Sequence, residues 1–566
     1  MSGPDRRRWL PAAVGAGTAL FWALLCLRWF DVGERFRPHW IEACPPGVLA
    51  LTTLALLGTW LRLRSDDLRW RGDGDRAGLL LVVGLAICFR LPLALQGAAG
   101  YTTPDGALSG IVAIRLREGI ERLVFVPHVP YSGSLKSHLT VPLSLLVDTP
   151  RAFALASVLF YALFVAAVHR LALRSGGPRA AVASGLYAAF APTFVTQYSL
   201  SNDGNYVELL ALGTWALWLA ARWTDEPDRR PTLALAAGVL LGLASWCHIL
   251  AMIHIAAVGL ALLAAAGLRA LRSLPWLGLG LALGYAPGLV WNAANGWESL
   301  HYVLPGGQRV GGSDGLTLGA RAVRMVSDHW PVLMGYDPGY PTSLDRLVAG
   351  LALCGVAAAV FAFVKARGGP VSVRRTLLLF TAVNIAVALV ALPHLDGNPR
   401  YLLFLAAPVS VFLGQALCRG AGRWALAALV AFGALGSLGQ AASKIEEDGT
   451  WRAFVARLED EGVRWCYSDF FVATRINFLS EERTICSAKL GPVMTEYFFD
   501  YRRRVEAAPE AALVAANHAY AAKLERRLEG LGVSYERLDL LKPVLLRVSR
   551  KVEPEELFPD RAFPYR

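Results

Sequence analysis

The sequence predicts an α-helical polytopic membrane protein that ends in a small extracytoplasmic α/β domain. Three observations support this prediction. Apolar runs of membrane-spanning length recur about thirteen times along the 566 residues. Hydrophobic residues make up 55% of the chain and the mean hydropathy is +0.42, which is more than a soluble core can bury. Arginines crowd alternate connecting loops, a pattern typical of one face of a membrane.

A run of about 17 to 25 apolar residues can cross a bilayer as a helix. The predicted spans cover residues 9–30, 46–62, 78–96, 152–172, 180–200, 206–223, 231–248, 250–268, 274–293, 347–365, 376–393, 401–418 and 424–442. The first run is too long for a cleaved signal peptide and ends in Arg28, Trp29 and Phe30 instead of small residues. We therefore expect it to remain as a span.

The positive charges predict the orientation of the chain. With thirteen spans, the arginine-rich segments all fall on one side of the membrane: 6–8, 62–76, 170–179, 222–230, 269–272, 365–375 and 419–423. The positive-inside rule makes that side cytoplasmic, so the amino terminus is expected inside and the carboxyl terminus outside. The excess of arginine over lysine, with much alanine and leucine, indicates a GC-rich bacterial genome and hence a bacterial inner membrane.

The charge and the cysteines argue against two other classes. The net charge is +12, but the arginines lie in short loops beside apolar runs, so nucleic acid is not an expected partner. The eight cysteines are scattered and lack the paired spacing of a zinc site or a dense disulfide framework.

Three regions are predicted along the chain: two leading spans in 1–76, a transmembrane domain in 77–442 with long outer loops 97–150 and 295–345, and the α/β domain in 443–566. In the last region, helix patterns at 451–460 and 520–531 alternate with strand patterns at 463–467, 483–486, 512–516 and 544–548. Cys466 and Cys486 lie on neighbouring strand candidates, where they form either a disulfide or two buried thiols. We interpret this domain as a cap.

The functional signals concentrate in the outer loops. Asp105 follows the third span closely, which places a carboxylate at the membrane surface. Arg90 lies inside an apolar run, where an ionisable residue either marks a site or reaches the interface as an anchor. The same loop continues through Tyr131 and Lys136 in a polar, aromatic segment that can fold back over a cavity.

A second outer carboxylate, Asp203, lies in the next outer loop, and Glu208 follows at the head of a helix. Carboxylates from separate loops could converge. Asp-Gly is also a common turn dipeptide. The turn interpretation is favoured for Asp314 and Asp396, and a functional one for Asp105 and Asp203.

A third element places Arg400 and Tyr401 at the outer mouth of a span, shortly after His394. The planar guanidinium of arginine matches two phosphate oxygens and stays charged. The alternative is an interfacial Arg-Tyr anchor. His248, near the outer turn between two spans, could reach the same phosphate or could pack between helices, and Glu298 in the later long loop could line an acceptor groove.

Three motifs resemble those of the GT-C integral-membrane glycosyltransferases, a group with the protein O-mannosyltransferases and the bacterial enzyme that transfers aminoarabinose to lipid A. The runs Phe89-Arg-Leu-Pro and Pro104-Asp-Gly-Ala-Leu resemble the first-loop acidic motif, Tyr198-Ser-Leu-Ser-Asn-Asp the second-loop acidic motif, and Arg400-Tyr-Leu-Leu-Phe-Leu-Ala-Ala-Pro the late Arg-Tyr-Leu signature. The resemblance covers roughly residues 78–442. Many members carry a second acid directly after the first-loop Asp; here that position is Gly106, which weakens any paired-carboxylate or metal role.

The resemblance implies a glycosyltransferase that moves a sugar from a polyprenyl-phosphate donor to a glycan, lipid or protein acceptor on the outer face. A base for the acceptor hydroxyl and cationic groups for the departing phosphate are the main chemical needs. The roles expected by analogy are catalytic for Asp105 and Asp203, which would also hold a divalent cation (Mg²⁺ or Mn²⁺) if one is used; donor phosphate-binding for Arg400, Tyr401, His248 and Arg90; and acceptor or loop contacts for Tyr131, Lys136, Glu298 and His394.

Two other functions remain open. A transporter or lipid-linked glycan flippase would also have many spans, but it would be expected to show internal repeats with broken helices in matching halves, and no such repeat is evident. A glycan polymerase or ligase on the same scaffold differs from simple transfer only in its substrate.

Overall fold

The computed structural model describes residues 75–201, 205–303, 316–336, 343–365, 371–390, 399–491, 494–539 and 543–559, with parts of one helix between residues 14 and 25. The first predicted span is described only in that fragment, and the second predicted span, residues 46–62, lies outside the described residues.

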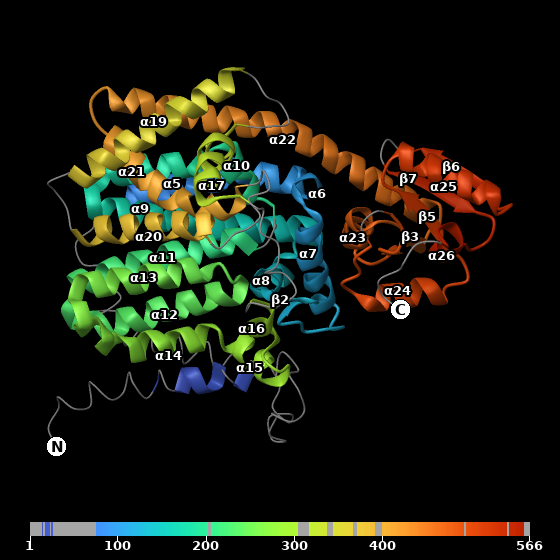
Figure 1. Cartoon of the computed structure of the whole chain (residues 1–566), viewed down its shortest axis with the longest axis horizontal. Helices are drawn as coiled ribbons and strands as arrows, with labels where there is room; N and C mark the ends of the chain where they lie inside the picture. The colour runs from blue at the N-terminus through green and yellow to red at the C-terminus, as the bar shows by residue number, and fades with distance from the viewer. Residues whose placement is uncertain are drawn as a thin grey trace.

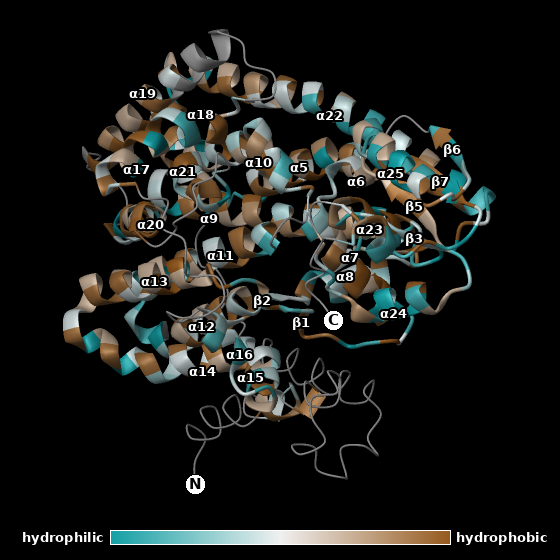
Figure 2. Ribbon diagram, turned by 45° about the vertical axis from the view of Figure 1, so that its right-hand side comes forward, coloured by the Kyte–Doolittle hydropathy of each residue, from teal (hydrophilic) through white to brown (hydrophobic). Residues whose placement is uncertain are grey.

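The larger part of the molecule is a bundle of helices that run side by side (Figure 1). Seven described helical stretches are long and apolar enough to cross a membrane: Arg76–Gln96 (α5), Thr149–Ala189 (α9), Arg230–Cys247 (α12), Ala251–Gly284 (α13 to α14), Val371–Val390 (α20), Arg400–Leu417 (η6 and α21) and Gly422–Asp460 (α22). Tyr206–Asp225 (α11) and Ser343–Lys365 (α19) complete the bundle. The count of thirteen spans and the orientation of the termini remain predictions. Figure 2 shows hydrophobic residues prevailing on the bundle helices.

The predicted span 152–172 lies in the first half of α9. The predicted span 180–200 covers the second half of α9 and the start of the segment that follows it. α9 changes direction at Gly177, whose φ of 77° and ψ of −174° are not helical, and Pro178 follows it. Glycine tolerates this left-handed backbone, and the proline then starts the second half. The second half ends at Ala189, and the rest of the predicted span 180–200 contains the separate short helix Thr193–Tyr198 (α10).

Close backbone contact joins α12 to Leu274–Gly284 (α14). A Cβ atom on Gly238 would lie 2.2 Å from the Leu277 carbonyl oxygen, and one on Gly280 would lie 2.2 Å from that of Leu235. One turn later, Gly242 and Gly284 each lie similarly close to a carbonyl oxygen of the facing helix. Small residues spaced four apart let helices in a membrane approach to backbone contact, as they do here.

The first long loop is more ordered than its turn-forming residues predict. It contains Ala98–Tyr101 (α6), Pro104–Arg117 (α7), a hairpin of Phe125–Val126 (β1) and Val129–Gly133 (β2), and Leu135–Leu143 (α8). α7 begins with Thr103 as N-cap, whose side chain accepts a hydrogen bond from the Gly106 amide, and with Pro104 in its first turn. Asp105-Gly106 is therefore a helix start and not an isolated turn. We call the end of the bundle that carries α6, α7, α8, β1 and β2 the loop end.

Four elements lie within the spanning stretches named above: Ala251–Ala266 (α13), Gly267–Ser273 (η4), Arg400–Leu405 (η6) and Ala406–Leu417 (α21). The short elements between the longer helices are Pro227–Arg229 (η3), Ala286–Ala294 (α15), Glu298–Val303 (α16), Leu318–Arg324 (α17), Met325–His329 (η5) and Trp330–Leu333 (α18).

The carboxyl-terminal part is a mixed α/β domain that α22 joins to the bundle (Figure 1). Its sheet has the order β4-β3-β5-β7-β6, in which Trp465–Tyr467 (β3) is parallel to Ile485–Ser487 (β4) and Ala512–Ala515 (β5). Val544–Val548 (β7) is antiparallel to β5 and to Tyr535–Asp539 (β6). The helices are Phe470–Leu479 (α23), Phe499–Ala507 (α24), His518–Gly530 (α25) and Pro554–Leu557 (α26). The four predicted strands are confirmed, whereas β6, α23, α24 and α26 were not predicted.

Cys466 and Cys486 are paired in register on β3 and β4 and form a disulfide, with their Cα atoms 4.4 Å apart. Of the two alternatives drawn from the sequence, the structure has the disulfide.

Candidate functional site

Aromatic side chains from five separate segments meet at the loop end. The ring of His248, in the turn after α12, lies 5.3 Å from the Tyr131 ring and 5.4 Å from the Tyr206 ring. Tyr131 also packs at 4.9 Å on Tyr302 of α16, and Tyr206 lies 6.5 Å from Tyr401 of η6. We call Tyr131, Tyr206, His248, Tyr302 and Tyr401 the aromatic cluster. It brings together three predicted site residues, Tyr131, His248 and Tyr401.

Arg400 stands at the start of η6 beside this cluster. Its guanidinium donates a hydrogen bond of 3.3 Å to the Tyr401 hydroxyl and lies 5.2 Å from the centre of that ring. Through the rings of Tyr401 and Tyr206 it is linked to the ring of His248. Arg400 and Tyr401 are half-buried, so this cation is placed where an anion could approach from the surface.

Asn205 holds three parts of the cluster together. Its side-chain amide donates to the Ser132 hydroxyl at 3.0 Å, the Gly133 carbonyl at 2.9 Å and the Cys247 carbonyl at 3.0 Å. Its backbone is left-handed, with φ of 57°, a conformation that asparagine adopts more readily than most residues. The hairpin, the end of α12 and the head of α11 are thereby fixed beside Tyr131, His248 and Tyr206.

Lys136, which the sequence predicts as an acceptor or loop contact, is almost fully buried. Its ammonium lies 3.2 Å from a Glu208 carboxylate oxygen and donates to the Ser157 hydroxyl at 3.0 Å. The side-chain exposures are 1% for Lys136 and 0% for Glu208, so this is a buried ion pair. A buried charge needs such a partner, and the pair joins α8 to the head of α11.

Arg90, which the sequence predicts as a donor phosphate contact, lies inside the bundle. It is completely buried and donates to the Ser199 hydroxyl at 2.7 Å and the Ala189 carbonyl at 2.6 Å, while its guanidinium lies 3.7 Å from the centre of the Tyr161 ring. The physical reason is that a charge inside an apolar bundle must be satisfied by the chain itself. Arg90 therefore anchors the segment that contains Ser199, which leads into the second acidic motif.

The other predicted residues are spread over the loop end or lie outside the description. Asp105 is exposed in the first turn of α7, and Glu298 is exposed at the start of α16. Asp203 and His394 lie outside the described residues. Among the residues that the structure describes, no group of three or more His, Cys, Asp or Glu side chains could hold a metal ion, so we derive no step through a cation.

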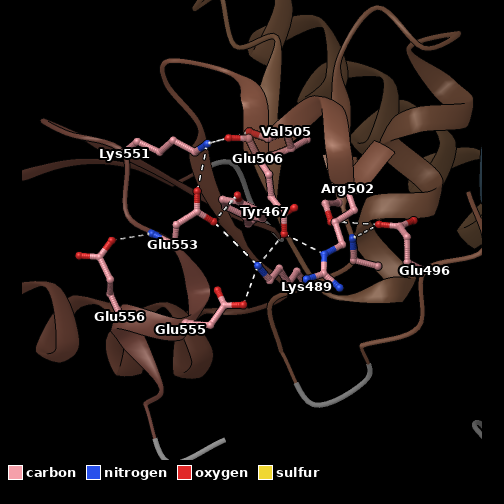
Figure 3. Close-up of polar contacts among 12 residues, drawn as sticks. Tyr467, Lys489, Glu496, Arg502, Val505, Glu506, Lys551, Glu553, Glu555 and Glu556 are labelled. Atoms are coloured by element: carbon pink, nitrogen blue, oxygen red, sulfur yellow. Dashed lines mark hydrogen bonds and ion pairs between the residues drawn. The ribbon is translucent and has the colours of Figure 1, made fainter. Parts of the chain in front are cut away.

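A further charged cluster lies inside the carboxyl-terminal domain (Figure 3). The Lys489 ammonium lies 2.8 Å from Glu506 and 2.7 Å from Glu555, and the Tyr467 hydroxyl donates to Glu553 at 2.6 Å. These contacts tie α26 to the sheet and to α24. Nearby, burial raises the pKa of Glu496 to about 7, although Ser487 and the Ala488 amide donate hydrogen bonds to it.

Sequence reasoning missed two residues that organise the loop end, Asn205 and Arg115. Arg115 lies in the apolar stretch of α7, and a charge in an apolar run was the signal that had drawn attention to Arg90. No comparable signal marks Asn205, because its role depends on partners that are distant in the sequence.

This chain is similar to known proteins in part of its sequence and in its fold. Residues 139–291 match the family model described as dolichyl-phosphate-mannose-protein mannosyltransferase. Among solved structures, ArnT from Cupriavidus metallidurans in the apo state is 14% identical, with a TM-score of 0.59 over 82% of this chain and 97% of that chain. The same ArnT bound to undecaprenyl phosphate is 15% identical, with a TM-score of 0.58 and the same coverage. No curated protein sequence matches the chain.

The ArnT likeness establishes the fold, and the matched segment 139–291 contains the second half of α8, all of α9, α11 and α12, and His248. The predicted resemblance is therefore confirmed at two levels: the chain has the fold of ArnT, and residues 139–291 are similar to the mannosyltransferase family model.

Proposed function

We propose that the protein transfers a sugar from a polyprenyl-phosphate donor to a cell-envelope acceptor at the loop end of the bundle, on the outer face of a bacterial inner membrane. The observation that carries this proposal is the meeting of Arg400, Tyr401 and His248 with Tyr131 at one end of the bundle. The solved ArnT bound to undecaprenyl phosphate supports a lipid-linked donor.

The donor phosphate is assigned to Arg400 and the Tyr401 hydroxyl. As the bond between the sugar and the phosphate breaks, negative charge grows on the phosphate oxygens. A guanidinium and a hydroxyl held beside those oxygens stabilise that charge, and they act more strongly in a site with little water. The aromatic cluster supplies flat apolar faces on which a sugar ring can rest. We assign His248, which lies against Tyr131 and Tyr206 in this cluster, to the same phosphate.

The acceptor hydroxyl is assigned to Asp105. A carboxylate can take the hydroxyl proton as the oxygen attacks the sugar carbon, which is general base catalysis. Asp105 is exposed at the first turn of α7, so an acceptor can reach it. Asp203 is the second carboxylate candidate, and if a divalent cation takes part these two acids are where we propose that it binds.

The test is transfer from a panel of radiolabelled polyprenyl-phosphate sugars by the purified full chain in native-like membranes. We expect transfer by the wild type and at least about a hundredfold loss in Asp105→Asn and in Arg400→Ala, because each removes a group that acts in the transition state. Asp228→Asn, an exposed aspartate in η3 near the opposite end of α11, is the matched control. No transfer from any donor, or transfer that is indifferent to both changes, would remove the proposal.

A further inference from the structure

Helix α7 belongs to the core of the carboxyl-terminal domain although it comes from the first outer loop. Ala107, Leu108, Ile111, Val112 and Ile114 form one buried hydrophobic cluster with the sheet and with α23. The contact is close at Gly110, where a Cβ atom would lie 2.3 Å from the Phe478 ring. Nearly every turn of α7 is thus fixed by residues that lie more than 300 positions later in the chain.

Arg115, near the end of α7, is enclosed by the same domain. Its guanidinium lies 2.9 Å from Glu482, 2.7 Å from Asp500 and 3.2 Å from Glu121 of its own loop. The rings of Phe498 and Tyr501 lie 4.4 and 4.8 Å from it. The Arg115 side chain is only 2% exposed, so these contacts replace water and hold the helix in one position along its axis.

The turn after α23 completes this attachment. Glu481 accepts a hydrogen bond of 2.8 Å from the Thr149 amide and pairs with Arg117 at 3.0 Å. Glu481 and Glu482 both have left-handed backbones, with φ of 49° and 61°. Such conformations cost free energy for residues other than glycine and persist where the surroundings demand them. The strain is explained by the directions of the two side chains, because the carboxylates of Glu481 and Glu482 must point at different parts of the outer loop.

The other side of the same loop rests on the bundle. The Ser137 hydroxyl of α8 donates to the Ser109 carbonyl of α7 at 2.8 Å, one turn after Asp105. The Trp246 indole donates to the Val124 carbonyl at 2.9 Å, beside the hairpin. α7 therefore lies between the carboxyl-terminal domain and the rest of the loop end, and its first turn carries Asp105.

We propose that Arg115, Glu481 and Glu482 are positioning residues: they fix α7 to the carboxyl-terminal domain and thereby hold Asp105 in place for the transfer step. This inference rests on the proposed function and assigns a role to the domain that the motifs leave unexplained. It requires that loosening α7 lowers kcat while the donor still binds.

The experiment compares Glu482→Gln and Gly110→Ala with the wild type, each as full-length protein in native-like membranes. Glu482→Gln removes one charge from Arg115 and leaves Asp500 in place. Gly110→Ala moves α7 away from α23 without changing any charge. Arg483→Ala is the matched control, because Arg483 is adjacent in sequence, 59% exposed and paired with Glu459 within the domain.

We expect faster hydrogen exchange across residues 104–117 in both variants, kcat lowered by about ten- to a hundredfold, and a donor KM within about twofold of the wild type. Adding Phe478→Leu to Gly110→Ala makes room for the methyl group and should restore part of the lost kcat. Arg483→Ala should change none of these quantities.

Two results would overturn the inference: unchanged exchange in 104–117 in both variants, or faster exchange with wild-type kcat. If Glu482→Gln does not fold, Gly110→Ala alone and with Phe478→Leu still decides the matter. Hydrogen exchange does not depend on turnover, so a wild type that transfers no sugar would refute the proposed function and not the attachment of α7.

Discussion

The first outer loop rests on two different surfaces, and they hold it by different chemistry. Towards the bundle, the contacts are aromatic rings, uncharged hydrogen bonds from Asn205 and Trp246, and one buried ion pair between Lys136 and Glu208. Towards the carboxyl-terminal domain, the centre of the contact is Arg115 with its carboxylates. Charges are expensive at membrane depth, which explains why the bundle side uses few of them.

The two surfaces each carry an arginine, and we assign these arginines different functions. Arg115 is surrounded by carboxylates and rings of its own chain, and Arg400 is half-buried beside Tyr401. An incoming phosphate would meet the carboxylates around Arg115 as like charges. We therefore assign the donor to the bundle side and the fixing of Asp105 to the side of the carboxyl-terminal domain.

The largest expected effect is on the bundle side, from Lys136→Met. It leaves the Glu208 carboxylate, which has 0% exposure, without its cation, and removing one partner of a buried pair costs about 3 to 5 kcal/mol. The measurement is thermal unfolding in detergent. The double variant Lys136→Met with Glu208→Leu should recover most of the loss, since no buried charge remains. A single variant as stable as the wild type would show that the pair does not bear on stability.

On the other side, replacing Cys486 by serine opens the link between β3 and β4. The bond closes a loop with a sequence separation of 20 residues, and its loss should destabilise the carboxyl-terminal domain by about 3 kcal/mol. Cys247→Ser, a buried thiol of the bundle, is the control. Thermal unfolding of the variant and of the wild type checks this, with the wild type measured with and without a reductant. A wild-type melting temperature that the reductant leaves unchanged would contradict it.

Glu496 predicts a pH dependence confined to the carboxyl-terminal domain. Its pKa is about 7 in the folded chain and about 4.5 when unfolded, so the folded state holds the proton more tightly. The stabilisation from the protonated carboxyl is fully present below pH 4.5 and is lost as the pH rises through 7, by up to about 3 kcal/mol. Glu496→Gln should flatten this profile between pH 5 and 7.5, as measured by unfolding. A variant whose profile follows that of the wild type would contradict the assignment.

The smallest expected effect is Tyr302→Leu in the aromatic cluster. Tyr302 packs on Tyr131, and an aromatic pair contributes about 0.5 to 1.5 kcal/mol beyond the area it buries. We expect a rise of roughly two- to tenfold in KM for the donor with kcat nearly unchanged. Steady-state kinetics measure the donor KM and kcat of the variant and of the wild type. A fall in kcat with constant KM would place Tyr302 in the chemical step instead.

The helices of the bundle could be predicted because hydrophobic length and arginine placement depend on the chain alone. The boundaries of α5, α11, α12 and α20 lie within a few residues of the predicted ones. α9 was predicted as two spans on either side of the arginine-rich segment 170–179, and the structure has its kink in that segment, at Gly177. The two motif residues Arg400 and Tyr401 do lie together with His248.

What could not be predicted depends on contacts between distant segments. The buried state of Lys136 follows from Glu208, and that of Arg90 follows from Ser199 and Tyr161. The helical state of α7 depends on packing against α23, which lies in another domain. Single-residue signals, such as a charge in an apolar run, identified the right kind of residue but not whether its partner is a ligand or the chain itself.

The central claim is that Arg400 binds the donor and that Arg115 fixes α7. Its most direct test is the affinity for undecaprenyl phosphate, measured in detergent or nanodiscs for Arg400→Ala and Arg115→Lys. The account predicts that Arg400→Ala raises Kd at least about tenfold, because a charge-assisted hydrogen bond to the phosphate is lost, while Arg115→Lys stays within about twofold of the wild type. Unchanged binding in Arg400→Ala, or a large loss in Arg115→Lys with a folded protein, would contradict it.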